Sequence, residues 1–278
     1  MPSPSEKAPS WGIMGEPCFS SAWIIVRKVI LLAHANSSIA KRIMVAIGIV
    51  FMLLIAGFAW YVSDYYHADE NALAAIADEN GPQDGVTVRK LSDDAIAFVA
   101  ENPHAGLVFY PGGKVQPESY APLLTRFAQK GITCVLIKPL FNLAILDMNA
   151  ADGIIGQFQD IQTWLLAGHS LGGVAASDYL SRHESEYAGI ILLAAYPSTD
   201  LSDYAGNVML VYGSNDGVMN REKYAEAKAK LPNSAHEEII DGGNHAFFGN
   251  YGFQEGDGTP SITREEQQEK TASALPAL

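Results

Sequence analysis

The chain has 278 residues, of which 48% are apolar and 18% are charged. This is enough for one good-sized globular domain or two small ones, and it is too apolar for a disordered protein. With 18 Lys and Arg against 31 Asp and Glu, the formal net charge is −13, and the chain lacks the clustered basic residues of a nucleic-acid-binding protein. The two cysteines exclude a disulfide scaffold and a Cys-based zinc module.

An apolar segment near the N-terminus predicts a transmembrane helix. The 20 residues from Ile43 to Val62 contain no charged side chain. A helix rises about 1.5 Å per residue, so this segment spans roughly 30 Å, the thickness of a bilayer core. Trp60 and Tyr61 are aromatic residues of the kind that gather at the membrane–water interface. We therefore expect the lipid bilayer to be a partner of residues 43–62.

The charges on either side of this segment predict its orientation. Residues 1–62 carry a net charge of +3 and the other 216 residues carry −16. Basic residues cluster before the segment, and six acids follow it before the first basic residue, Arg89. By the positive-inside rule, we expect residues 1–42 to be cytoplasmic and the C-terminal part to lie outside the plasma membrane. The apolar segment would then cross the membrane once and act as an uncleaved signal-anchor. A cleaved signal peptide is the alternative.

The remaining chain divides into a polar, Ala-rich stalk, residues 63–83, and a C-terminal domain, residues 84–278. In the domain, short apolar runs alternate with helical patterns, which predicts an α/β fold: a mostly parallel sheet with helices on both faces. The expected strands are Val86–Leu91, Ala95–Ala100, Gly106–Tyr110, Thr133–Lys138, Trp164–Ala167, Gly189–Ala194, Val208–Tyr212 and Glu237–Ile240. The expected helices are Pro117–Lys130, Met148–Thr163, one after Ser170, Arg221–Lys230 and one opened by the capping box Thr263–Glu266.

The sequence Gly168-His169-Ser170-Leu171-Gly172 matches the G-x-S-x-G pattern. It follows an expected strand and precedes an expected helix, which is the context that a nucleophile elbow requires. The glycines permit a sharp turn that exposes the Ser170 hydroxyl in a strained conformation, above the N-terminus of the helix. Ser170 is therefore the candidate nucleophile.

A serine hydroxyl needs a base, usually a histidine, and the histidine needs an acid to orient it. Of the seven histidines, His245 is the candidate base because it follows the last expected strand in a glycine-rich loop. Asp216 is the candidate acid because it directly follows the expected strand Val208–Tyr212. Asp200 and Asp203, which follow the preceding strand, are fallback candidates, whereas Asp241 is close to His245 but still at the strand end.

Two backbone N–H groups are expected to form an oxyanion hole. One is that of Leu171, the residue after the candidate nucleophile. The other belongs to the loop after Gly106–Tyr110 and is that of Gly113 or of Lys114, and this choice stays open. The side chain of Lys114 could also attract an anionic substrate.

From about Val86 to the C-terminus, these motifs resemble the α/β-hydrolase superfamily. The segments 109–115 (Phe-Tyr-Pro-Gly-Gly-Lys-Val) and 245–252 (His-Ala-Phe-Phe-Gly-Asn-Tyr-Gly) are similar to small, membrane-anchored bacterial hydrolases related to dienelactone hydrolase. The resemblance implies an α/β-hydrolase fold and hydrolytic activity. Dienelactone hydrolase itself has a Cys nucleophile where this chain has Ser170, which favours ordinary esters as substrates. The His-Gly oxyanion motif of the superfamily is replaced by Pro111-Gly112-Gly113.

The expected function is a membrane-anchored serine esterase acting on a small-molecule ester through an acyl-enzyme, without metal or cofactor. About 13 residues separate Ala194 from Val208, too few for the helical lid that many relatives insert there, although residues 141–156 could cover part of the pocket. An acyltransferase using the same residues, and a non-catalytic membrane-tethered binding domain, remain alternatives. Cys18 and Cys134 would lie on opposite sides of the membrane, and Cys134 is expected to be a buried free thiol.

Overall fold

A computed structural model describes residues 19–77 and 84–275. Two compact units make up the chain, residues 1–60 and residues 61–278. Cys134 is buried with a free thiol, as expected, and burial raises the pKa of that thiol well above its ordinary value. Cys18 lies outside the described residues, as do residues 1–17 of the expected cytoplasmic segment.

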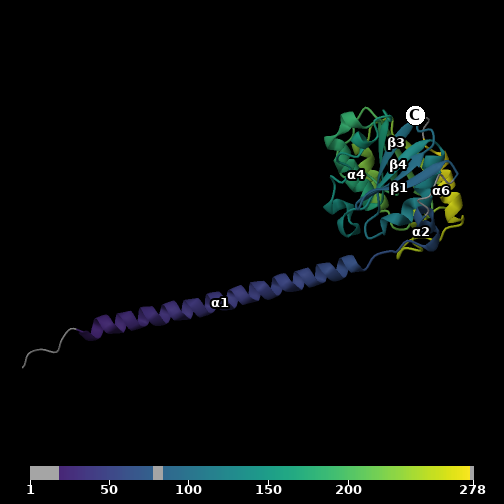
Figure 1. The fold of residues 1–278 in the computed structure, drawn as a ribbon. Helices are drawn as coiled ribbons and strands as arrows, with labels where there is room; N and C mark the ends of the chain where they lie inside the picture. Colours follow the sequence, from purple (N-terminus) through teal and green to yellow (C-terminus); the bar gives the residue numbers. More distant parts are fainter. Residues whose placement is uncertain (1–18, 78–83, 276–278) are drawn as a thin grey trace, which may run out of the picture. The chain divides into compact units, whose positions relative to one another are not determined.

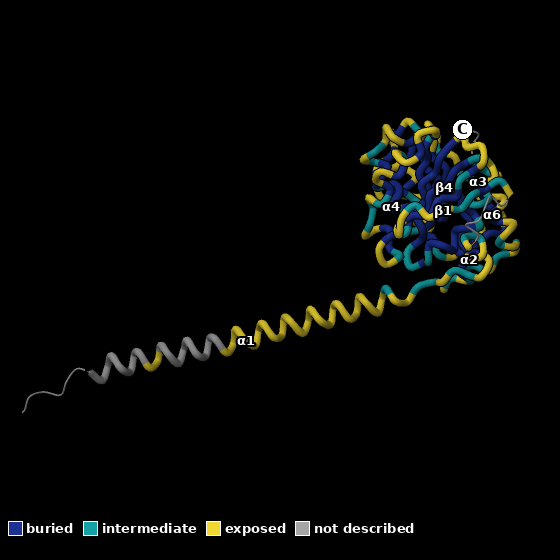
Figure 2. Tube along the Cα trace, in the orientation of Figure 1, coloured by how far each residue is buried: buried dark blue, intermediate teal, exposed yellow. Residues whose placement is uncertain are grey.

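The apolar segment lies in one long helix, α1 (Phe19–Ser63). Within it, Ser38–Ser63 is long and apolar enough to cross a membrane, and it is the one such helix among the described residues. None of its most apolar part is buried against protein (Figure 2). A helix with apolar side chains on all sides needs a nonpolar environment around it, since it has no polar face to present to water. This helix could therefore serve as a membrane anchor.

The second unit is built on an eight-stranded sheet with the order β1-β2-β4-β3-β5-β6-β7-β8. β1 and β2 form an antiparallel pair, β2 is antiparallel to β4, and all other neighbours are parallel. This confirms the α/β-hydrolase fold with a mostly parallel sheet. The strands are β1 (Val86–Ser92), β2 (Ala95–Ala100), β3 (Ala105–Tyr110), β4 (Ile132–Ile137), β5 (Trp164–His169), β6 (Gly189–Leu193), β7 (Asn207–Gly213) and β8 (His236–Ile240).

Helices cover both faces of the sheet. Figure 1 shows α4 and α6 on opposite sides of the strands. The α-helices of this unit are α2 (Glu70–Ala77), α3 (Ala121–Gln129), α4 (Leu171–Arg182), α5 (Arg221–Ala227) and α6 (Arg264–Ser273). The 3-10 helices are η1 (Pro117–Tyr120), η2 (Leu140–Asn142), η3 (Ala144–Leu146), η4 (Ile155–Gln157), η5 (Glu184–Glu186), η6 (Lys228–Lys230) and η7 (Ala246–Phe248). The expected capping box at Thr263 and Glu266 is confirmed, because each side chain accepts the other residue's backbone N–H.

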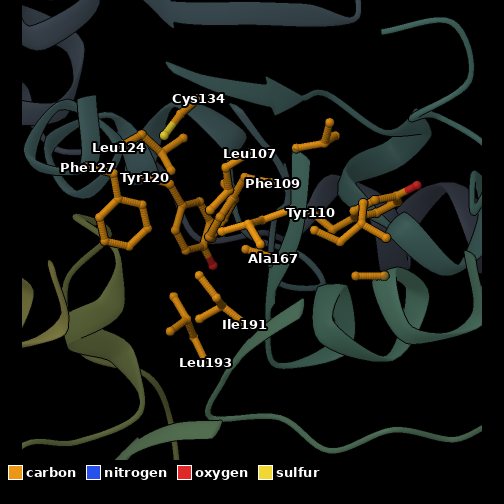
Figure 3. Close-up of a cluster of buried hydrophobic side chains, with 14 of the residues drawn as sticks. Leu107, Phe109, Tyr110, Tyr120, Leu124, Phe127, Cys134, Ala167, Ile191 and Leu193 are labelled. Atoms are coloured by element: carbon orange, nitrogen blue, oxygen red, sulfur yellow. The ribbon is translucent and has the colours of Figure 1, made fainter. Parts of the chain in front are cut away.

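The strands β3, β4, β5 and β6 are buried along their whole length. Their continuous apolar runs follow from burial on both faces, as in other parallel sheets. Figure 3 shows Leu107 and Phe109 near Leu124 and Phe127 in this core. Tyr120 is also fully buried there. Its ring packs against the ring of Phe109 in a tilted arrangement, with 4.9 Å between the two ring centroids. The rigid core fixes the strand ends from which the candidate site is built.

The expected helix over Met148–Thr163 was wrong. The structure has turns there, with one short 3-10 helix, η4. Gly153 has a φ of +72°, which a right-handed helix does not allow, and Gly156 adds a second residue of low helix propensity. The buried side chains Ala151 and Ile154 still pack into the core. The apolar spacing that indicated a helix therefore arises from a packed loop.

The expected stalk, residues 63–83, contributes to the second unit over its described part. Tyr66 forms a parallel bridge with Val115, and Ala72 in α2 is fully buried. The carboxylate of Asp69 accepts hydrogen bonds from the Asn250 side chain at 3.1 Å and from Arg264 at 3.2 Å. Residues 64–77 are thus attached to the sheet domain by specific polar contacts.

Candidate active site

The candidate nucleophile lies at a tight strand–helix turn. Ser170 follows β5 and precedes α4, with φ 51° and ψ −122°, a conformation that is strained for a residue with a side chain. A Cβ on Gly168 would lie 2.5 Å from the carbonyl of Gly172, and one on Gly172 would collide with the carbonyls of Tyr110 and Pro111. Only glycine fits at these two positions, so the G-x-S-x-G spacing is a steric requirement of the turn.

His245 and Asp216 are brought together by two loops at the same edge of the sheet. His245 Nδ1 donates to Asp216 Oδ2 at 2.9 Å, and their side chains are 1% and 0% exposed. The other carboxylate oxygen accepts the N–H groups of Val218 and Met219 at 2.9 and 2.8 Å. Burial acts to raise the pKa of Asp216, but these hydrogen bonds and the attraction to His245 outweigh it and lower the pKa.

The other nitrogen of His245, Nε2, is the atom that could accept a proton from a serine hydroxyl. It is buried and has no hydrogen-bond partner within the described residues. Ser170 and His245 line the same cavity of about 190 Å³. The other lining residues are largely apolar, and they come from α4 and from the loops after β6 and β7: Leu171, Val174, Ala194, Ala195, Tyr196, Val218, Met219 and Asn220. Residues 141–156, considered as a partial cover, do not contribute to this lining.

The loop after β3 lies against the start of α4. A Cβ on Gly113 would lie 2.8 Å from Leu171 Cδ2. The N–H of Gly112 donates to Tyr120 Oη at 3.0 Å, and that of Lys114 donates to the Asn142 carbonyl at 2.8 Å. The N–H of Gly113 has no acceptor among the residues that the structure describes. Leu171 opens α4, where first-turn amides have no intrahelical acceptor. Two adjacent backbone donors, those of Leu171 and Gly113, are therefore available.

A buried Tyr120–His169 pair lies beneath this loop, and the sequence interpretation gave neither residue a role. Tyr120 Oη and His169 Nδ1 are 2.7 Å apart, and His169 Nε2 lies 3.1 Å from the carbonyl of His245. Burial and then repulsion from His245 hold the pKa of His169 well below its usual range, so the ring is neutral. Because a carbonyl only accepts, Nε2 carries the proton and Nδ1 accepts from Tyr120. The loop of Gly112 is thereby joined to the backbone of His245.

A second unpredicted residue, Asp257, binds the two loops that carry His245 and Asp216. Its Oδ1 accepts the N–H groups of Gly217 and His245, each at 3.1 Å, and that of Gly258 at 2.8 Å. Its Oδ2 accepts the N–H of Ala246 at 2.8 Å. The glycines on either side of Asp257 indicate a turn in the sequence, but nothing in their pattern predicts which backbone its carboxylate binds.

The fallback acids lie elsewhere. Asp200 caps the N–H of Ser202 in an exposed turn, and the exposed Asp241 lies 3.4 Å from Ser214. Of the acids considered, the structure places Asp216 beside His245. Within the described part of the chain, no group of three or more His, Cys, Asp or Glu side chains is arranged to hold a metal ion.

Comparison with known proteins gives the family context. A family model described as the alpha/beta hydrolase family matches residues 106–269, more than half of the chain. No curated protein gives a significant sequence match.

Three solved structures illustrate the similarity of fold. A CIB-like hydrolase from Thermoplasma acidophilum is 15% identical with a TM-score of 0.50, and the match covers 68% of this chain and 98% of that chain. Dienelactone hydrolase from Anabaena variabilis is 14% identical with a TM-score of 0.49, covering 68% and 94%. Est1E from Butyrivibrio proteoclasticus is 13% identical with a TM-score of 0.48, covering 68% and 96%. At these identities the likeness concerns the fold alone.

Proposed function

Because the chain belongs to the alpha/beta hydrolase family, we propose that it is a membrane-anchored serine hydrolase that cleaves carboxylic esters. One observation carries this proposal: His245 donates to Asp216 through Nδ1, its buried Nε2 has no partner within the described structure, and His245 and Ser170 line the same cavity. An imidazole held in this way presents Nε2 as a proton acceptor for a serine hydroxyl. Ser170, His245 and Asp216 are thus the proposed catalytic residues.

In the proposed reaction, Ser170 Oγ attacks the acyl carbon while His245 Nε2 takes the hydroxyl proton. The tetrahedral intermediate collapses as the ester C–O bond breaks, and His245 gives the proton to the leaving alcohol. Water then attacks the acyl-enzyme, with His245 again accepting a proton. The carboxylic acid leaves and Ser170 regains its hydrogen. Asp216 holds the imidazole in the required tautomer and stabilises the imidazolium.

The oxyanion of each tetrahedral intermediate is proposed to accept the backbone N–H groups of Leu171 and Gly113. Gly113 is favoured over Lys114 because the Lys114 N–H already donates to Asn142. Fixed backbone donors stabilise developing charge without reorganising during the reaction. The N-terminal end of α4 adds its partial positive charge at the same place.

The membrane anchor is proposed to be the apolar part of α1, with the N-terminus in the cytoplasm and the catalytic domain outside the plasma membrane. The exposed apolar side chains of Ser38–Ser63 and the basic residues before them support this arrangement. Protease added to intact cells should then degrade the domain. Complete protection of the domain, with digestion only after the cells are opened, would contradict the orientation.

The catalytic proposal is tested by labelling the full chain, purified in detergent, with a fluorescent fluorophosphonate. We expect labelling of the unmodified protein and of Ser214→Ala, a control serine at the same edge of the sheet, but not of Ser170→Ala. p-Nitrophenyl acetate hydrolysis should follow the same pattern. A folded protein that neither labels nor hydrolyses the ester would reject the proposal and favour a binding domain. Preferential transfer of the acyl group to an added alcohol would instead indicate an acyltransferase.

A further inference from the structure

The chain that leaves the apolar segment is bound to the loop that carries Gly113. The N–H of Tyr66 donates to the Lys114 carbonyl at 2.8 Å, and the N–H of Gln116 donates to the Tyr66 carbonyl at 2.9 Å. Lys114 Nζ lies 3.1 Å from Asp64 Oδ2 and 4.6 Å from the centre of the Tyr61 ring. The oxyanion loop of the proposed site is therefore attached to the residues at the end of the apolar segment.

Chain length limits how far this loop can lie from the membrane boundary. Tyr61 and Val62 are the last residues of the expected transmembrane segment, and Asp64 is two residues beyond it. Two residues span at most about 7 Å. Since Asp64 pairs with Lys114, an anchor that ends at Val62 would hold the loop of Gly113 close to the lipid surface.

Exposed apolar side chains gather beside the same loop. In residues 64–275, as far as they are described, seven large apolar side chains are exposed, and four of them fall within seven residues: Leu140, Phe141, Ile145 and Leu146. Leu140 and Leu146 are 59% and 52% exposed. The Asn142 carbonyl in this segment accepts the Lys114 N–H at 2.8 Å, and η3 packs against α4, the helix that Ser170 precedes. The apolar segment thus packs against the loop after β3 and against α4.

The charge pattern fits a lipid surface better than a charged partner. Residues 139–146 contain no charged side chain, although residues 63–278 carry a net charge of −16. The nearby Lys138 is paired with Glu118 at 2.8 Å, and Lys114 with Asp64. Clustered exposed apolar residues are typical of membrane or protein contact sites. Attachment to the end of the apolar helix favours the membrane.

We infer that residues 140–146 lie in the interface of the bilayer that holds the anchor, so that the Ser170 cavity takes esters of amphiphilic molecules dissolved in that bilayer. This inference rests on the proposed function. The chain between β6 and β7 contains no helical lid, so nothing there shields an apolar acyl chain from water on its way to Ser170. A site at the lipid surface needs no such lid, because the substrate passes directly from the membrane into the cavity.

Insertion is tested without reference to activity. The full chain carrying Cys18→Ser is reconstituted in phosphatidylcholine vesicles, and an environment-sensitive fluorophore is attached at Ile145→Cys or, as a control, at Glu226→Cys, an exposed position in α5. Doxyl-labelled phosphatidylcholine should quench the fluorophore at position 145 and leave that at 226 unchanged. Equal quenching at both positions, or none at 145, would overturn the inference. If the fluorophore at position 145 is instead shielded as the protein concentration rises, with no quenching by doxyl lipid, a second copy of the chain covers this segment. That result would also overturn the inference.

The substrate class is tested with a double variant, Leu140→Ser with Leu146→Ser, in the same vesicles. Hydrolysis of p-nitrophenyl palmitate presented in the bilayer should fall about tenfold, since less apolar surface is buried in lipid, while hydrolysis of soluble p-nitrophenyl acetate stays unchanged. Ile239→Ser, which alters an exposed apolar residue of β8, should affect neither. Equal loss on both esters, or no loss on the palmitate, would contradict the inference. Failure of the unmodified protein on both esters would instead reject the proposed function.

Discussion

Asp257 holds His245 by its backbone: the carboxylate accepts the N–H of His245 at 3.1 Å and that of its neighbour Ala246 at 2.8 Å. The same carboxylate also accepts the N–H of Gly217, the residue that follows Asp216. One carboxylate therefore fixes the relative position of the two loops whose side chains form the candidate His–Asp pair. Since four backbone N–H groups converge on it, only an acceptor with two oxygens fits this place.

Asp257→Asn is expected to lower the rate of ester hydrolysis about tenfold or more. The amide NH2 group would face backbone N–H donors instead of accepting from them, so the loop of His245 would shift. Small displacements of catalytic groups lower the rate strongly. The measurement is kcat on p-nitrophenyl acetate together with its pH profile, which should change shape if His245 is displaced. Asp160→Asn, at an exposed position, is the control. An unchanged kcat and pH profile for Asp257→Asn would refute the positioning role.

Asp216→Asn is expected to reduce kcat by about 10³- to 10⁴-fold while leaving the protein folded, because the asparagine amide favours the wrong imidazole tautomer. Asp241→Asn, at the neighbouring strand end, should retain nearly full activity. Steady-state kinetics of both variants on p-nitrophenyl acetate distinguish the two acids. Comparable loss in both variants, or loss confined to Asp241→Asn, would mean that the acid is misassigned.

The lowered pKa of Asp216 also predicts a dependence of stability on pH. The folded-state pKa lies below the ordinary value of 3.8, so ionised Asp216 contributes stability above that pH, and this contribution is lost as the pH falls through the folded-state pKa. The difference in Tm between the unmodified protein and Asp216→Asn should therefore be largest near neutral pH and shrink below about pH 4. Thermal unfolding from pH 7 to pH 3 measures it. A difference that stays constant over this range would contradict the prediction.

Tyr120→Phe removes a hydroxyl that serves both Gly112 and His169. Each of the two buried polar groups left without a partner costs about 1–3 kcal/mol, so Tm should fall by roughly 4–24 °C, at about 2–4 °C per kcal/mol in a domain of this size. Activity at permissive temperature should also fall, with a changed pH profile, since the loop of Gly113 and the backbone of His245 lose their link. Tyr204→Phe is the matched control, because it removes a buried hydrogen bond to Tyr187 away from the site. A fall in Tm with unchanged activity would limit Tyr120 to a structural role.

The packing of residues 64–77 predicts that a shortened chain of residues 84–278 is less stable than one of residues 61–278. The shorter chain loses the buried Ala72, the Tyr66–Val115 bridge and the Asp69–Arg264 ion pair. We expect its Tm to be lower by roughly 5 °C or more, as measured by circular dichroism. Identical melting of the two chains would show that the segment acts as a stalk.

Local patterns in the sequence were enough to predict most of the strands, the apolar helix and the turn at Ser170. Continuous apolar runs predicted the strands, the absence of charge over 43–62 predicted a helix able to cross a membrane, and Gly168-His169-Ser170-Leu171-Gly172 predicted the strand–turn–helix. These features depend on residues that are close together in the chain, so their spacing carries the information. The helix expected over Met148–Thr163 failed because apolar spacing alone does not distinguish a helix from a packed loop, and Gly153 adopts a positive φ.

Relations between distant segments were decided by the tertiary structure. The strand order brings the loops after β3, β5, β7 and β8 to one edge of the sheet, and only there does Asp216, rather than Asp200 or Asp241, meet His245. Likewise, the Lys114 N–H donates to Asn142 whereas the Gly113 N–H has no acceptor among the described residues, and the Asp257 carboxylate binds backbone amides from two other loops. Hydrogen bonds depend on distance and direction in space, which the order of residues in a chain does not specify until the core has packed.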